Sequence, residues 1–149
     1  ALAMQQGLPA DRFYLLRKIP VDFQLAPTQV LAAIAQIQPR AVICCGMAEK
    51  RSQLSLESSG TKLDAITGKP LEKIATKVNL DKLVEGLTIT KVSHSAGKFV
   101  CNALYHSVLS HLHDRSPATN CIFIHVPVLT AANSGAILAD FMAILRAFL

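Results

Sequence analysis

The sequence lacks the long apolar run that a membrane-spanning helix needs. Polar or charged residues interrupt every apolar stretch before it reaches about 18 residues. Residues 1–13 also lack the basic segment and the long apolar segment of a secretory signal peptide. From these two absences we expect a cytoplasmic protein without a membrane partner.

The chain also has little charge and few aromatic residues. Only 17% of its 149 residues are charged and 51% are hydrophobic, which argues against an intrinsically disordered chain. The net charge is +5, but the basic residues are scattered, without a basic block and with little aromatic interleaving. We therefore expect no nucleic-acid partner. The length suits one domain, residues 1–149, and no internal repeat divides it.

Cysteine is too scarce for a disulfide framework in a chain of this size. There are four, and Cys44 and Cys45 are adjacent residues, so reduced thiols are expected. Cys44, Cys45 and Cys121 lie in apolar strand patterns and are expected in the core. This leaves Cys101 as the cysteine available for chemistry.

Strand and helix patterns alternate, which favours an α/β fold with a mostly parallel sheet covered by helices. The apolar run 40–48 predicts a strand buried on both faces, whereas the alternating run 51–58 predicts a half-exposed strand. Mixed signals from 58 to 77 predict a loop with one edge strand at most. Further strands are expected at 13–21, 88–95 and 121–129, and helices at 27–39, 79–87, 98–114 and 135–149.

Cys101 is a candidate nucleophile because it lies in the first turn of the predicted helix 98–114. Free backbone N–H groups and the positive end of the helix dipole stabilise a thiolate at that position. The helix follows a strand directly, so Cys101 should lie at the carboxyl edge of the sheet. In α/β proteins with parallel sheets this edge carries the functional site.

His125 and Glu57 are candidates for the base and for the group that orients it. His125 is a polar residue near the carboxyl end of an apolar strand, on the same edge as Cys101 if both strands are parallel. Glu57 ends the strand 51–58 and could hold the imidazole in place. Each residue also has a structural interpretation. Free cysteines are mostly packing residues, strand histidines are mostly hydrogen-bonded core residues, and a terminal glutamate is mostly solvated.

The other histidines do not suggest a metal site. His106, His111 and His113 lie on one predicted helix, but only His106 and His113 share a face. Two histidines on one face are too few for a protein metal site, so no metal is expected.

Three motifs resemble the pyroglutamyl peptidase family, whose members are also called pyrrolidone-carboxylate peptidases. The chain is similar to the family patterns P-x-x-V-[IL]-x-x-G-x-A-x-x-R-x-x-[IL]-x-x-E, V-S-x-x-A-G-x-[FY]-V-C-N-x-x-x-Y and F-I-H-V-P. The resemblance covers the chain from about residue 13 to its end. The matching residues are Gly46, Ala48, Arg51, Leu54, Glu57, Val92, Ser93, Ala96, Gly97, Phe99, Val100, Cys101, Asn102, Phe123, Ile124, His125, Val126 and Pro127.

The resemblance implies a three-layer α/β/α sandwich and a Cys–His–Glu triad. It implies a peptide substrate, from which an N-terminal pyroglutamyl residue is removed by hydrolysis without a cofactor. Cys101 would be the nucleophile, His125 the base and Glu57 the orienting acid. Val100 and Asn102, beside Cys101, are the expected substrate-binding residues. Members of the family often self-associate, so a homo-oligomer is possible.

The chain departs from the family pattern in two places. It begins after the family's first strand and T-G-F-x-P-F-like loop, so we expect a domain that lacks this part. After Glu57 the family has E-R-x-A-x-N, whereas here Ser58 replaces the arginine and the asparagine is absent. Two alternatives therefore stay open: a hydrolase for another N-terminal amide, and a non-catalytic homologue that serves binding or assembly.

Overall fold

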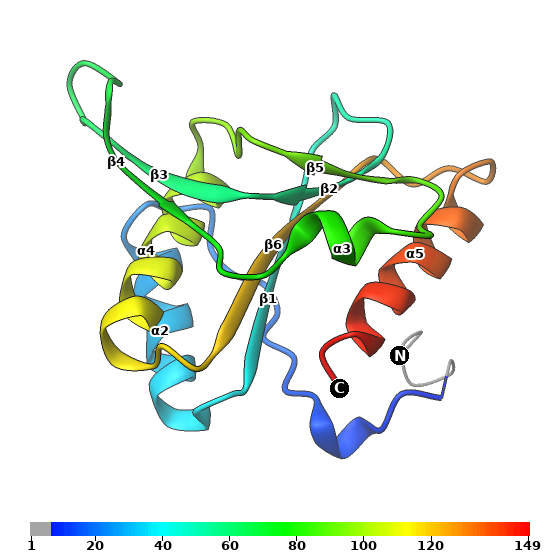
Figure 1. Ribbon diagram of the computed structural model, residues 1–149. Coiled ribbons are helices and arrows are strands. Elements are labelled where there is room, and N and C mark those ends of the chain that lie inside the picture. The colour runs from blue at the N-terminus through cyan, green and yellow to red at the C-terminus, as the bar shows by residue number, and fades with distance from the viewer. Residues whose placement is uncertain (1–6) are drawn as a thin grey trace.

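A four-stranded sheet forms the centre of the computed structural model, which describes residues 7–149 (Figure 1). Its strands, in spatial order, are β1 (Ala41–Met47), β6 (Asn120–Val126), β2 (Leu54–Glu57) and β5 (Thr90–Ser93). β1 pairs with β6 and β2 with β5 in parallel, while β2 and β6 are antiparallel. The expectation of a mostly parallel sheet is therefore confirmed.

Helices cover both faces of this sheet (Figure 1). α2 (Leu25–Ile37) and α4 (Val100–Arg115) pack on one face, and α3 (Leu80–Val84) and α5 (Ser134–Arg146) pack on the other. A 3-10 turn, η1 (Ala10–Arg12), precedes them. The four expected helices and the three-layer α/β/α sandwich are confirmed. No helix within residues 7–149 is long and apolar enough to cross a membrane.

The strands divide their side chains between two hydrophobic cores because successive residues of a strand point to opposite faces. Cys121 and Phe123 of β6 lie in the core with α2 and α4. Ile122 and Ile124 lie in the core with α3 and α5. β6 is thus the buried strand that its apolar run predicted.

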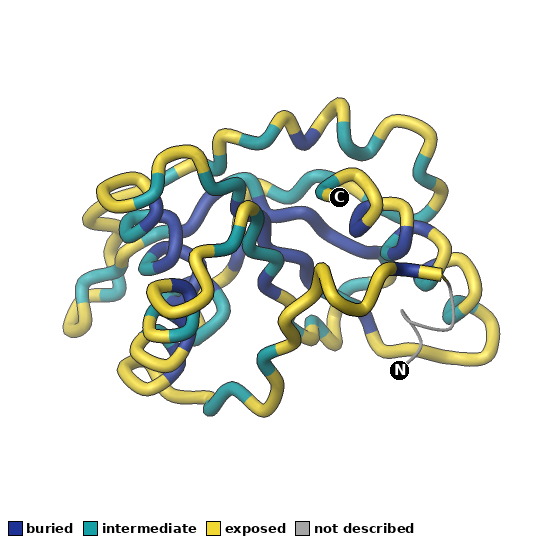
Figure 2. Tube along the Cα trace, turned by 90° about the horizontal axis from the view of Figure 1, so that it is seen from below, coloured by how far each residue is buried: buried dark blue, intermediate teal, exposed yellow. Residues whose placement is uncertain are grey.

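β2 is buried on both faces, which corrects the expectation of a half-exposed strand. Leu54 and Leu56 join the core with α3 and α5, so Ser55 and Glu57 face α4. The central strands form the dark-blue interior of Figure 2. The alternating pattern does form a strand, but its polar face points into the protein rather than to solvent.

β1 is only partly buried, so the expectation of a strand buried on both faces is wrong. It lies at one end of the sheet, with no further strand beside it among residues 7–149. Cys44 is buried, whereas Cys45 is exposed and Met47 is 69% exposed. Cys45 is therefore not the core residue that its apolar surroundings suggested.

Residues 13–21 do not form the expected strand. Lys18 has a φ of 57°, in the left-handed region, which interrupts an extended run. Pro20 has no N–H to donate to a neighbouring strand. Tyr14 and Leu15 are 65% and 71% exposed, so the segment keeps apolar side chains on the surface.

Residues 58–77 contain a β-hairpin rather than a loop with one edge strand. β3 (Ser59–Leu63) and β4 (Pro70–Ala75) pair antiparallel, and the turn between them projects from the body of the molecule (Figure 1). The side chain of Asn102 in α4 accepts a hydrogen bond from the Thr61 N–H at 2.9 Å. It also donates to the Thr61 carbonyl at 2.7 Å. The amide thus pairs with β3 as a neighbouring strand would.

Gly60 permits this close contact between β3 and α4. A Cβ at this position would lie 2.3 Å from the backbone nitrogen of His106 and 2.6 Å from its Cα. We expect Gly60→Ala to lower the free energy of unfolding by about 3 kcal/mol, because a helix backbone cannot move aside. Urea unfolding measures this change.

Gly135→Ala in α5 is the matched control, because a Cβ there meets nothing within 4 Å. It should leave the stability unchanged or raise it by up to about 1 kcal/mol. Equal destabilisation by the two substitutions would contradict the role assigned to Gly60.

Candidate active site

Cys101 lies in the first turn of α4, as the sequence predicted. The helix begins at Val100, and the first hydrogen bond back to its cap runs from the Ala103 N–H to the Phe99 carbonyl at 3.2 Å. The N–H groups of Val100, Cys101 and Asn102 therefore precede the regular helical hydrogen bonds. They and the helix dipole provide a positive field at the sulfur.

The sulfur of Cys101 rests against β1. A Cβ on Gly46 would lie 2.7 Å from Cys101 Sγ and 3.1 Å from the Phe123 ring. Gly46 is paired with His125 across the β1–β6 ladder. Because Gly46 has no side chain, the thiol of Cys101 can lie beside His125.

The imidazole of His125 connects Cys101 to Glu57. Its Nδ1 lies 2.7 Å from Glu57 Oε1, and the same ring interacts with Cys101, which raises the pKa of the histidine. Glu57 is fully buried and His125 is 5% exposed. The hydroxyl of Tyr105 donates to the Glu57 carbonyl at 3.0 Å. The structure therefore brings together all three residues that the sequence singled out, in the order carboxylate, imidazole, thiol.

They meet for a different reason from the one inferred from strand direction. β6 is antiparallel to β2, and β2 is parallel to β5, so the carboxyl ends of β5 and β6 point in opposite directions. Ser93, the last residue of β5, is level with Glu57 and Phe123. The segment 94–99 then crosses the sheet and starts α4 where Cys101 reaches Gly46. The expectation that parallel strand ends unite the site is wrong.

Opposing effects set the pKa of His125. Burial favours the neutral imidazole and would lower this pKa. The hydrogen-bonding and electrostatic interactions of the ring with Cys101 and Glu57 outweigh burial and raise this pKa from 6.5 to about 9. At neutral pH the ring is therefore protonated, which is the form that pairs with a thiolate.

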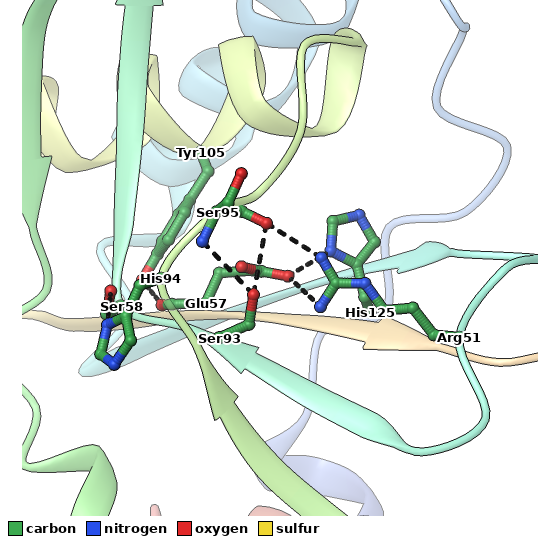
Figure 3. A network of polar contacts seen from close by, with 8 residues as sticks. All are labelled: Arg51, Glu57, Ser58, Ser93, His94, Ser95, Tyr105 and His125. Carbon is green, nitrogen blue, oxygen red and sulfur yellow. Dashed lines mark hydrogen bonds and ion pairs between the residues drawn. The ribbon is translucent and has the colours of Figure 1, made fainter.

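Arg51 is a further member of the site, from the connection between β1 and β2. Its Nη1 lies 2.8 Å from Glu57 Oε1, and its Nη2 donates to the Ser95 carbonyl at 2.9 Å. Figure 3 shows the guanidinium between these two groups and beside His125. The sequence placed Arg51 within a matching motif, but gave no sign of its long-range partners.

Val100 and Asn102 flank Cys101 in the first turn of α4. Val100 is half-buried. The side-chain amide of Asn102 is occupied by Thr61 of β3, so this side chain fixes the hairpin to the helix. Their part in substrate binding stays a prediction.

His106, one of the helix histidines, pairs with the hairpin. Its Nε2 lies 2.8 Å from Glu72 Oε2. Within residues 7–149 no three His, Cys, Asp or Glu side chains are grouped so that they could hold a metal ion.

Comparisons with known proteins relate this chain to one family. A profile of the family described as pyroglutamyl peptidase matches residues 66–139. The pyrrolidone-carboxylate peptidase of Bacillus subtilis is 29% identical over 131 aligned residues, covering 75% of this chain and 61% of that protein. The enzyme of the same name from Vibrio vulnificus is 30% identical with the same coverage. This chain is a homologue of the pyroglutamyl peptidases.

Solved pyroglutamyl peptidase structures share the fold. The pyroglutamyl peptidase I of Bacillus amyloliquefaciens matches with a TM-score of 0.73 and 20% identity, covering 86% of this chain and 76% of that one. The pyrrolidone carboxyl peptidase of Thermococcus litoralis matches with a TM-score of 0.72 and 18% identity, covering 86% and 74%. The chain spans 61% of the Bacillus subtilis and Vibrio vulnificus relatives.

The raised pKa of His125 predicts a pH-dependent stability of this pyroglutamyl peptidase homologue. From pH 6.5 to about 9 the folded chain keeps a proton on His125 that the unfolded chain releases. The free energy of unfolding should therefore fall by a few kcal/mol as the pH rises through this window, and the full contribution should be present below it. Urea unfolding at several pH values measures the slope.

His125→Gln is the reference for this measurement, because it removes the titrating group. The wild-type chain should show the steeper fall between about pH 6.5 and 9. Parallel curves for the two proteins would contradict the raised pKa.

Gly46→Ala tests the placement of the thiol. The new Cβ would lie 2.7 Å from Cys101 Sγ, so the sulfur must leave its position beside His125. We expect the alkylation of Cys101 by iodoacetamide to slow at least about tenfold, while stability falls by only about 1 kcal/mol. Mass spectrometry of the peptides separates Cys101 from the exposed Cys45, which should react as in wild type. An unchanged rate at Cys101 would show that its sulfur does not depend on Gly46.

Proposed function

We propose that this chain acts as a cysteine peptidase that hydrolyses the amide bond after an N-terminal pyroglutamyl residue of a peptide. The observation that carries the proposal is the hydrogen bond from His125 to the buried Glu57, together with the interaction of the same imidazole with Cys101 at the start of α4. A thiol beside an imidazole that a buried carboxylate orients is the arrangement that acyl transfer needs. Homology to pyroglutamyl peptidases supports the choice of substrate.

In the first step the thiolate of Cys101 attacks the carbonyl carbon of the pyroglutamyl amide. The imidazolium of His125 then gives its proton to the leaving amine, and a thioester remains on the sulfur. In the second step the neutral imidazole takes a proton from water, whose oxygen attacks the thioester. Pyroglutamate leaves, and the thiolate–imidazolium pair is restored.

Glu57 binds Nδ1 of His125, which leaves Nε2 to exchange protons at the sulfur side. The developing oxyanion would be stabilised by the backbone N–H groups in the first turn of α4, at Cys101 and Asn102. A well-placed donor of this kind is worth about 3 to 4 kcal/mol in the transition state. Val100 and Asn102 are the residues proposed to contact the substrate beside the nucleophile, and Asn102 would do so through its backbone N–H because Thr61 occupies its side-chain amide.

A second candidate is a thiol hydrolase for another N-terminal amide. The observation that favours it is the segment after Glu57, which differs from the family pattern. Ser58 replaces the family's arginine, and its hydroxyl lies 2.9 Å from His94 Nδ1 (Figure 3). The side chains near the acid are therefore not those of the relatives, and a different acyl group is a reasonable substrate.

Release of aminomethylcoumarin from pyroglutamyl and free aminoacyl amides tests both candidates. We expect the chain to cleave the pyroglutamyl amide, Cys101→Ala to be inactive, and Glu57→Gln to lose a factor of about 10⁴ in kcat. Cys45→Ala, at an exposed thiol, should keep full activity.

The pattern of cleavage decides between the candidates. Cleavage of an aminoacyl amide without cleavage of the pyroglutamyl amide would overturn the first candidate in favour of the second. A folded chain that cleaves neither amide would contradict both.

A further inference from the structure

Arg51 joins two parts of the site that come from distant segments of the chain. One guanidinium nitrogen lies 2.8 Å from the carboxylate of Glu57 at the end of β2. The other donates at 2.9 Å to the carbonyl of Ser95, in the segment 94–99 that leads to Cys101. The Arg51 side chain is 22% exposed, whereas its partner Glu57 is completely buried.

We propose that Arg51 is a positioning residue for the Cys101–His125 pair. Its guanidinium fixes the position of the segment 94–99 relative to the carboxylate of Glu57. Its positive charge also weakens the stabilisation that Glu57 gives to the protonated form of His125. The consequence for turnover rests on the proposed function. The positioning itself concerns the thiol and the imidazole, which can be followed without a substrate.

The first part of the proposal follows from the shape of the guanidinium. Its planar fork presents two nitrogens at a fixed separation, so one side chain can bind a carboxylate and a carbonyl together. The Ser95 carbonyl also accepts from the Ser93 hydroxyl at 3.2 Å, and the Ser95 N–H donates back at 3.4 Å. These bonds shape the turn at the end of β5, and Arg51 links that turn to the carboxylate of Glu57.

The second part follows from a shared acceptor. Arg51 Nη1 and His125 Nδ1 both contact Glu57 Oε1, at 2.8 and 2.7 Å, so the two nitrogens are at most about 5.5 Å apart. A positive charge at that distance disfavours protonation of an imidazole. Ser55, which is paired with His125 across the β2–β6 ladder, is uncharged. Within residues 7–149, the titratable groups that interact with the ring or with its partner carboxylate are Glu57 of β2, Cys101 of α4 and Arg51.

Two substitutions distinguish the effect of the positive charge of Arg51 from the effect of its planar pair of nitrogens. Arg51→Gln removes the positive charge, whereas Arg51→Lys keeps the charge but cannot reach both partners with a planar pair of nitrogens. The pKa of His125 is read from NMR titration of its ring carbons, assigned with His125→Gln. The reactivity of Cys101 is read from its rate of alkylation by iodoacetamide, followed by peptide mass spectrometry.

We expect Arg51→Gln to raise the pKa of His125 by about one unit, because a like charge has been removed. Arg51→Lys should leave that pKa near the wild-type value. Both variants should alkylate Cys101 at least about tenfold more slowly, because the segment 94–99 is no longer tied to Glu57. If Arg51 had only a structural role, Arg51→Gln would not raise the pKa of His125 while Arg51→Lys left it unchanged.

Arg115→Gln is the control, with the same loss of charge on an exposed residue at the far end of α4, about 20 Å from Cys101. It should change neither measurement. The proposal is overturned if Arg51→Gln fails to raise the pKa of His125, or if Arg51→Lys alkylates Cys101 at the wild-type rate. If the wild-type chain cleaves no pyroglutamyl amide, the proposed function fails, while these two measurements still decide the role of Arg51.

Discussion

The hydrogen bond between Glu57 and His125 is the interaction on which the rest of the site depends. A fully buried carboxylate is costly unless it is paired, and here one oxygen receives both His125 at 2.7 Å and Arg51 at 2.8 Å. The pairing is possible because β2 and β6 are antiparallel neighbours whose polar residues share one face. The acid thus fixes the ring, and the ring in turn meets the thiol.

Helix α4 places the nucleophile because three kinds of contact hold the helix itself. Its apolar residues pack against α2 and the sheet. Asn102 pairs with the backbone of Thr61, and Gly60 lets β3 touch the helix backbone at His106. Tyr105 reaches the backbone of Glu57. The first turn, which carries Cys101, is therefore anchored both to the hairpin and to the strand that bears the acid.

The local patterns predicted the helices, the buried strand β6 and the three residues that meet in the site, because periodicity and caps are encoded in neighbouring residues. Strand direction is not encoded in this way, so the antiparallel contact of β2 with β6 could not be read from the chain. The burial of β2 differs from the half-exposed strand that its alternating pattern predicts, because its polar residues, Ser55 and Glu57, face the site instead of solvent. Functional residues commonly break the local rule in this manner.

Contacts between residues far apart in the sequence account for the other differences between the predicted and the observed structure. The hairpin β3–β4 depends on the amide of Asn102, forty-one residues from Thr61, and the position of Arg51 depends on Ser95, forty-four residues away. Residues 13–21 have the composition of a strand, but Lys18 adopts a positive φ and no strand within residues 7–149 pairs with them. β-propensity alone does not make a strand without a partner.

The most direct test of the site is an NMR titration of His125 in the wild-type chain and in Glu57→Gln. With the ring paired to both the carboxylate and the thiol, we expect a pKa of about 9 in the wild type. The loss of the negative charge at Glu57 should lower it by more than about one unit. A wild-type pKa near 6.5, or one that does not change in Glu57→Gln, would contradict the carboxylate–imidazole–thiol arrangement on which the proposed function rests.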